Sequence, residues 1–128
     1  MTLDSSSIVA ILFEESGYLD LVDRILEADN VRVSAPTLVE ASLVVAGRRR
    51  AAASGEVEAF VKELGVTVVP FGEEEWHAAV VALQRFGRGR HRAALNFGDC
   101  LAYAAASVAG DSLLFVGDDF RATDTTPA

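Results

Sequence analysis

The sequence begins with MTLDSSSIVAILF at residues 1–13, in which Asp4 is the sole charge. The apolar residues before Asp4 predict a short buried strand at about residues 1–3, and the serines after it suit the start of a helix over residues 6–13. An unpaired carboxylate in a buried segment is costly, so it is usually protonated, hydrogen-bonded or bound to a cation. This stretch therefore predicts a first strand–helix unit with a functional carboxylate at the end of the strand.

Three further apolar runs carry isolated carboxylates in the same way. They are residues 33–47 with Glu40, residues 93–110 with Asp99, and residues 112–120 with Asp118 and Asp119. No Lys or Arg lies within any of the four runs to act as a counter-charge. If the fold gathers these acids, the natural counter-charge is a divalent metal ion with oxygen ligands.

Strands and helices alternate along the rest of the chain. β-Branched and apolar runs predict strands at about residues 1–3, 31–34, 66–69 and 112–116. Helical periodicity and capping signals predict helices over residues 6–13, 18–28, 36–47, 54–64, 73–86 and 98–109. This order predicts an α/β protein, a three-layer α/β/α sandwich around a short parallel sheet of four or five strands. With no internal repeat or linker, residues 1–128 should form one domain.

The predicted elements bring the acids towards one edge of the sheet. Asp4 and the Asp118–Asp119 pair follow strands, Glu40 lies one turn into the helix after the second strand, and Asp99 lies in the first turn of a helix. Ligands of open parallel sheets bind beyond the carboxyl ends of the strands. We therefore expect the four acidic positions to face one crevice.

Each acid also has a simpler structural interpretation. Asp4 could only cap the first helix, and Asp99 could only complement a helix dipole beside a capping Asn96. Asp118 and Asp119 could be turn residues, and Glu40 could be an exposed acid on the outer face of its helix. A metal site requires that these structural roles do not account fully for any of the four acidic positions.

The charge balance is acidic overall but contains two basic clusters. The net charge is −8, which by itself argues against a nucleic-acid partner. The clusters are Arg48, Arg49 and Arg50, and then Arg85, Arg88, Arg90 and Arg92. Both could contact phosphate, and both could equally be solvated helix ends.

The remaining composition points to a cytoplasmic protein. The single cysteine, Cys100, excludes an internal disulfide framework and is interpreted as a small buried hydrophobic residue. The N-terminus lacks the basic region of a secretory signal, and no apolar stretch suggests a membrane span.

Four quoted motifs together resemble the PIN-domain ribonucleases, specifically the VapC-type toxins of toxin–antitoxin pairs. The motifs are Asp4-Ser5-Ser6, Glu40, Asn96-Phe97-Gly98-Asp99 and Gly117-Asp118-Asp119-Phe120. The resemblance implies that Asp4 and Asp99 bind Mg²⁺ or Mn²⁺ directly. It implies that Glu40 and Asp119 complete the pocket as ligands, water-mediated ligands or general base. It also implies that Ser6, Asn96 and Asp118 lie next to these acids and support them without contacting the ion.

The same resemblance implies an activity and partners. It implies a PIN-like fold and a metal-dependent endoribonuclease that hydrolyses RNA phosphodiester bonds, with basic side chains among Arg85, Arg88, Arg90 and Arg92 holding the RNA backbone. It also implies a VapB-like antitoxin that neutralises the enzyme, and a homodimer. Two alternatives stay open: a PIN-like nuclease that processes RNA or DNA outside a toxin–antitoxin pair, and a non-catalytic PIN-like interaction module.

Overall fold

Four short parallel strands form the sheet of the described chain, which comprises residues 1–50 and 55–128 of a computed structural model. In spatial order they are β3 (Thr67–Val69), β2 (Arg32–Ser34), β1 (Thr2–Leu3) and β4 (Leu113–Leu114). Thr2 pairs with both Arg32 and Leu113, which makes β1 an interior strand. The expected short parallel sheet is confirmed.

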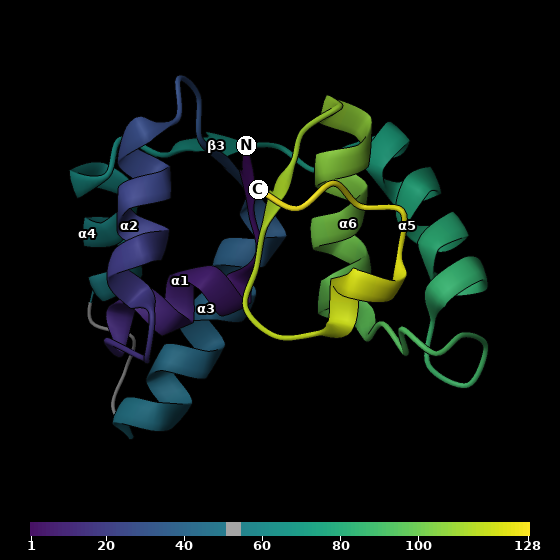
Figure 1. Ribbon diagram of the computed structural model, residues 1–128, viewed down its shortest axis with the longest axis horizontal. Coiled ribbons are helices and arrows are strands. Elements are labelled where there is room, and N and C mark those ends of the chain that lie inside the picture. Colours follow the sequence, from purple (N-terminus) through teal and green to yellow (C-terminus); the bar gives the residue numbers. More distant parts are fainter. Residues whose placement is uncertain (51–54) are drawn as a thin grey trace.

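Helices cover both faces of this sheet. They are α1 (Ser5–Leu12), α2 (Tyr18–Glu27), α3 (Ala35–Arg49), α4 (Glu56–Glu63), α5 (Glu73–Phe86) and α6 (Phe97–Ala109), followed by the 3₁₀ helix η1 (Asp119–Ala122). Figure 1 shows α2 and α4 on one side of the sheet and α5 and α6 on the other. The expected three-layer α/β/α architecture is therefore confirmed.

Each face of the sheet has its own hydrophobic core. Leu3 and Leu114 pack with residues of α1 to α4, whereas Leu113 packs with α5, α6 and Phe120 of η1. Leu113 and Leu114 enter different cores because successive side chains of a strand point to opposite faces. A strand of only two residues thus contributes to both layers.

Most elements end within one residue of the expected position, and two differ by two residues. β4 ends at Leu114 instead of residue 116, because its partner β1 gives way to α1 and the Val116 amide donates to the Ser6 hydroxyl instead. The third helix continues to Arg49 instead of residue 47. The expected start of the fourth helix at residue 54 lies outside the described residues, and α4 begins at Glu56.

The first arginine cluster stabilises the packing of helices. Arg48 forms an ion pair with Glu15, and Arg49 forms one with Glu56. Both guanidinium groups also lie over the ring of Phe13, at 5.0 and 4.4 Å from its centroid. These contacts account for two of the three arginines without any phosphate ligand.

Cys100 is free and buried, as the sequence indicates. Burial raises the pKa of its thiol to about 11, so the side chain is neutral in the core. Among the described residues, none of the helices has the length and hydropathy needed to cross a bilayer.

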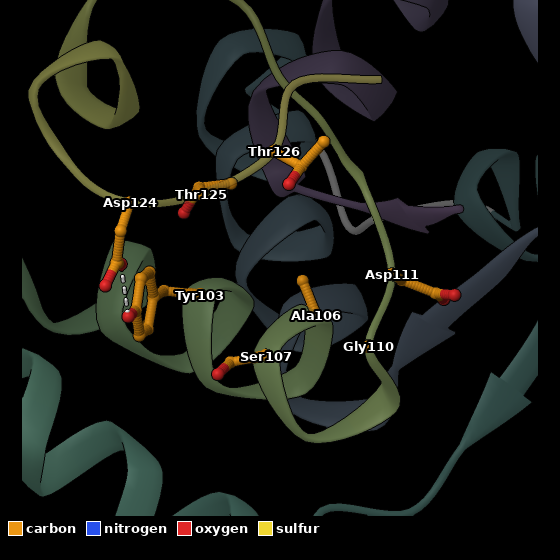
Figure 2. Close-up of a pocket in the computed structure, with 8 residues that line it drawn as sticks. All are labelled: Tyr103, Ala106, Ser107, Gly110, Asp111, Asp124, Thr125 and Thr126. Atoms are coloured by element: carbon orange, nitrogen blue, oxygen red, sulfur yellow. Dashed lines mark hydrogen bonds between the residues drawn. The ribbon is translucent and has the colours of Figure 1, made fainter.

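The segment after η1 is fastened to α5 and α6. Figure 2 shows the Tyr103 hydroxyl donating a hydrogen bond to Asp124, and the oxygen–oxygen distance is 2.6 Å. Arg85 forms an ion pair with the other carboxylate oxygen of Asp124 at 3.0 Å. The hydrogen bond from Tyr103 lowers the pKa of Asp124, while burial raises the pKa of Tyr103 to about 12. These contacts hold η1, and with it Asp119, beside α6.

Replacing the Tyr103 hydroxyl should weaken this attachment. We expect Tyr103→Phe to lower the free energy of unfolding by about 1 kcal/mol, since a buried hydroxyl loses a charged but solvent-exposed partner. Tyr18→Phe is the matched control, because no described residue accepts a hydrogen bond from the Tyr18 hydroxyl. Urea denaturation followed by circular dichroism measures both; equal effects of the two substitutions would show that Tyr103 and Asp124 do not stabilise the fold.

Candidate active site

Asp4 lies immediately after β1 and caps α1. Its Oδ2 accepts hydrogen bonds from the Ser6 amide, at 2.9 Å, and from the Ser6 hydroxyl. The capping interpretation of Asp4 is thus correct for one oxygen. The other oxygen, Oδ1, is buried and has no hydrogen-bond partner among the described residues, and the residue is only 3% exposed. Capping alone therefore does not explain this carboxylate.

The electrostatic surroundings of Asp4 favour its neutral form. Burial is the main cause of its raised pKa, and the nearby negative charge of Glu40 raises the pKa further. The two hydrogen bonds from Ser6 act in the opposite direction. A cation beside Oδ1 would remove both unfavourable effects.

Asp99 occupies the third position of α6 and forms a reciprocal cap with Asn96. Its Oδ2 accepts from the Asn96 amide at 2.8 Å, and the Asn96 Oδ1 accepts from the Asp99 amide at 2.9 Å. Burial, followed by the charges of Asp4 and Asp119, raises the pKa of Asp99 to about 6. The Asn96 hydrogen bond and the charge of Arg88 partly offset this rise. Asp99 thus shares an electrostatic environment with two of the other predicted acids.

Glu40 lies against the backbone of α6 at Gly98. A Cβ atom on Gly98 would collide with the carboxylate of Glu40, so the present position of that carboxylate depends on the absence of a side chain at residue 98. Glu40 is half-buried, which excludes the interpretation as an exposed acid on the outer face of α3. No role was predicted for Gly98 from the sequence. The one sequence feature that could have indicated a close contact there is the glycine itself, directly before Asp99.

Asp118 and Asp119 differ in their surroundings. Asp118 is exposed and forms an ion pair with Arg121 at 2.9 Å. Asp119 begins η1, and its charge contributes to the raised pKa of Asp99. Ser6 connects this region to Asp4, because its hydroxyl donates to Asp4 and accepts from the Val116 amide at 3.0 Å. Of the pair, Asp119 is the one coupled to the other acids.

The second arginine cluster begins with Arg85 in the last turn of α5 and continues with Arg88, Arg90 and Arg92 in the loop between α5 and α6. Hydrogen bonds from Leu95 to Phe86 and from Arg88 to Leu95 close the base of this loop. Arg88, Arg90 and Arg92 are exposed and form no ion pair with any described residue, whereas Arg85 is held by Asp124 and lies over Phe86. Three of the four predicted RNA-binding arginines are thus available to an external phosphate.

The donor set fits a hard divalent ion, although it does not form a closed cage. Within residues 1–50 and 55–128, no three carboxylate, imidazole or thiolate groups surround one point closely enough to coordinate an ion together. The orphaned Oδ1 of Asp4 and the raised pKa values of Asp4 and Asp99 are nevertheless what an oxygen-ligated cation would relieve. Asp4, Glu40, Asp99 and Asp119 supply the carboxylate oxygens that Mg²⁺ or Mn²⁺ prefers.

Comparison with known proteins gives one consistent family. Residues 1–125 match the model of the PIN domain. A ribonuclease VapC of Mycolicibacterium smegmatis is 38% identical over 97% of this chain and 96% of its own length. Ribonucleases VapC36 and VapC42 of Mycobacterium tuberculosis are 41% and 40% identical, over 97% and 100% of this chain and 90% and 98% of theirs.

A solved structure supports the same fold. It is a toxin–antitoxin complex from Klebsiella pneumoniae, whose matching chain is 14% identical with a TM-score of 0.70. The match covers 99% of this chain and 95% of that one.

Gly98 offers a test of the position of Glu40. In Gly98→Ala, the flexible end of Glu40 can move away from the new methyl group, so the free energy of unfolding should change by less than about 1 kcal/mol. The displaced carboxylate should nevertheless weaken Mn²⁺ binding by about 10- to 100-fold, as measured by calorimetry. The control is Gly47→Ala, where an added Cβ meets nothing within 4 Å and Mn²⁺ binding should not change. Unchanged Mn²⁺ affinity in Gly98→Ala would exclude Glu40 from the ion site.

The raised pKa of Asp99 predicts a pH-dependent stability without metal. Folding raises this pKa from 3.8 to about 6, so the stability that the protonated group contributes is full below about pH 4 and is lost as pH rises through about 6. Asp99→Asn keeps a neutral acceptor for the Asn96 amide, so this variant should be more stable than the parent at about pH 8 and equally stable at about pH 4. The exposed Asp23→Asn is the control, and thermal melts in EDTA measure all three proteins. A constant difference across this pH range would contradict the assignment.

Proposed function

This chain belongs to the PIN-domain family, among the VapC ribonucleases, and from that premise we propose that it is a metal-dependent endoribonuclease toxin. In this proposal it hydrolyses RNA phosphodiester bonds with Mg²⁺, or Mn²⁺ as an alternative, bound by Asp4, Glu40, Asp99 and Asp119. The observation that carries the proposal is the buried Oδ1 of Asp4, which has no partner among the described residues and lies near two other acids.

The proposal gives each acid a task. Asp4 and Asp99 would hold the ion directly, because each uses one oxygen for a helix cap and keeps the other for a ligand. Glu40 and Asp119 complete the negative pocket, and one of them accepts the proton of the attacking water. When bound, the ion supplies a more acidic water and neutralises charge on the phosphate.

The neighbouring side chains keep this arrangement in place. Ser6 and Asn96 orient Asp4 and Asp99 through the hydrogen bonds described above, and Gly98 leaves room for Glu40. Such supporting contacts commonly affect metal affinity or activity by 10- to 100-fold. Asp118 has a lesser role, since it is paired with Arg121.

In this proposal the loop between α5 and α6 binds the RNA. Arg88, Arg90 and Arg92 would hold phosphates beside the acids, which reconciles an RNA substrate with a net charge of −8. Arg85 contributes indirectly by holding the segment after η1. Because attack by water does not use the 2′-hydroxyl of RNA, the products should carry 5′-phosphate and 3′-hydroxyl ends.

The proposal includes the partners that the family resemblance implies. These are a VapB-like antitoxin that blocks the acidic pocket and a second copy of the chain in a homodimer. A cytoplasmic location follows, because the RNA substrate is there. Growth arrest upon expression, relieved by the antitoxin, distinguishes this function from RNA or DNA processing outside such a pair.

Neutralising single acids tests the reaction. We expect Asp4→Asn and Asp99→Asn to lower the rate of RNA cleavage by more than about 100-fold, because each loses a charged ligand. Both should remain folded, since asparagine also caps helices. A fluorescent single-stranded RNA incubated with Mg²⁺, Mn²⁺ or EDTA provides the assay, with product ends mapped by sequencing.

Three comparisons complete this test. Asp23→Asn, on the exposed face of α2, should cleave like the parent protein. Asp119→Asn should lose more activity than Asp118→Asn, because only Asp119 is coupled to Asp99. Full activity of Asp4→Asn, or cleavage undiminished by EDTA, would disprove the metal-dependent mechanism.

A further inference from the structure

Phe97 is the most exposed of the large apolar side chains in the described chain. It is 72% exposed although it begins α6, whose next three residues are buried. Neither hydrophobic core includes it. A single exposed apolar residue is common on protein surfaces, so its exposure gains meaning only from its surroundings.

A groove of about 450 Å³ lies beside Phe97, between the end of α5 and the start of α6. Its apolar lining includes Val80, Leu83 and Leu95, and its charged lining consists of Arg88 and Arg90. This volume is within the range of roughly 300 to 1,000 Å³ that small-molecule sites occupy. An apolar surface with an aromatic ring and two cations matches the parts of a nucleotide, a flat base and phosphates.

The groove adjoins Asp99, one of the four acids, through two of its lining residues. Asn96 lines it and forms the reciprocal cap with Asp99. Arg88 also lines it, and its charge lowers the pKa of Asp99. Phe97 itself lies two residues before Asp99 in α6, so a nucleotide bound in the groove would adjoin a phosphate held near Asp99. Complementary charge favours RNA over an apolar partner here, because neither arginine is paired within the described residues.

We propose that the ring of Phe97 stacks against an unpaired nucleobase adjoining the scissile phosphate, while Arg88 and Arg90 contact the flanking phosphates. This assignment rests on the proposed ribonuclease function and narrows its substrate to single-stranded RNA, because a paired base has no free face. Gln84 lines the same groove, and its amide offers a donor and an acceptor to the base edge. Stacking supplies affinity for any base, and Gln84 supplies a preference among bases.

The test measures binding without cleavage. A fluorescein-labelled single-stranded RNA is titrated in EDTA and followed by anisotropy, together with a series in which one nucleotide at a time is made abasic. We expect the parent protein to bind about tenfold more weakly when the stacked base is missing. Phe97→Ala should bind the intact RNA about tenfold more weakly than the parent does. It should bind the intact RNA and each abasic RNA with the same affinity.

Matched variants separate stacking from other roles of Phe97. Phe97→Trp should restore the sensitivity to the missing base, whereas Phe97→Leu, which keeps an apolar side chain without a ring, should not. Leu19→Ala, at a residue 62% exposed on α2 at the far side of the sheet, should bind like the parent. Arg88→Ala with Arg90→Ala should reduce the salt dependence of binding.

Several outcomes would overturn the proposal. They are equal binding by Phe97→Ala and the parent, full binding by Phe97→Leu, and no RNA binding by the parent at all. A smaller sedimenting species for Phe97→Ala would instead place Phe97 in an interface with a second copy. If the parent binds and senses the missing base but does not cleave RNA with Mg²⁺ or Mn²⁺, the ribonuclease function fails while the stacking site stands.

Discussion

The burial of carboxylates at the carboxyl edge of a parallel sheet is the constraint on which the candidate site depends. All four strands of the described chain run the same way, so the segments that follow them meet at one edge. Asp4, Glu40 and Asp119 come from such segments, and Asp99 joins them from the first turn of α6. The charge of Glu40 contributes to the raised pKa of Asp4, and the charges of Asp4 and Asp119 contribute to the raised pKa of Asp99. Burial at this edge makes a cation the natural counter-charge.

Helix caps allow the chain to fold around these charges. Asp4 and Asp99 each give one oxygen to the first turn of a helix, where orphan amides and the helix dipole favour a negative charge. The second oxygen of each carboxylate is left without this support, and for Asp4 it is buried. Structural and functional interpretations of these acids are therefore compatible, because they concern different atoms of the same side chain.

Arginines of similar sequence context serve different purposes. Arg48 and Arg49 pair with Glu15 and Glu56 and so fasten helices, even though they resembled a phosphate-binding cluster in the sequence. The loop after α5 instead leaves Arg88 and Arg90 exposed next to Asp99 and Phe97. A protein of net charge −8 can in this way present a local basic surface to RNA.

The sequence by itself determined the order of strands and helices, the three layers and the identity of the isolated acids, because apolar periodicity and capping residues are local signals. It did not determine that β4 stops at Leu114, since that end depends on a hydrogen bond from Val116 to the distant Ser6. The family resemblance favoured Asp119 over Asp118, but only the tertiary structure showed Asp119 coupled to Asp99, Asp118 paired with Arg121, and Glu40 lying against Gly98. These distinctions depend on contacts between residues far apart in the chain, and spacing along a sequence carries no information about which side chains meet across a folded core.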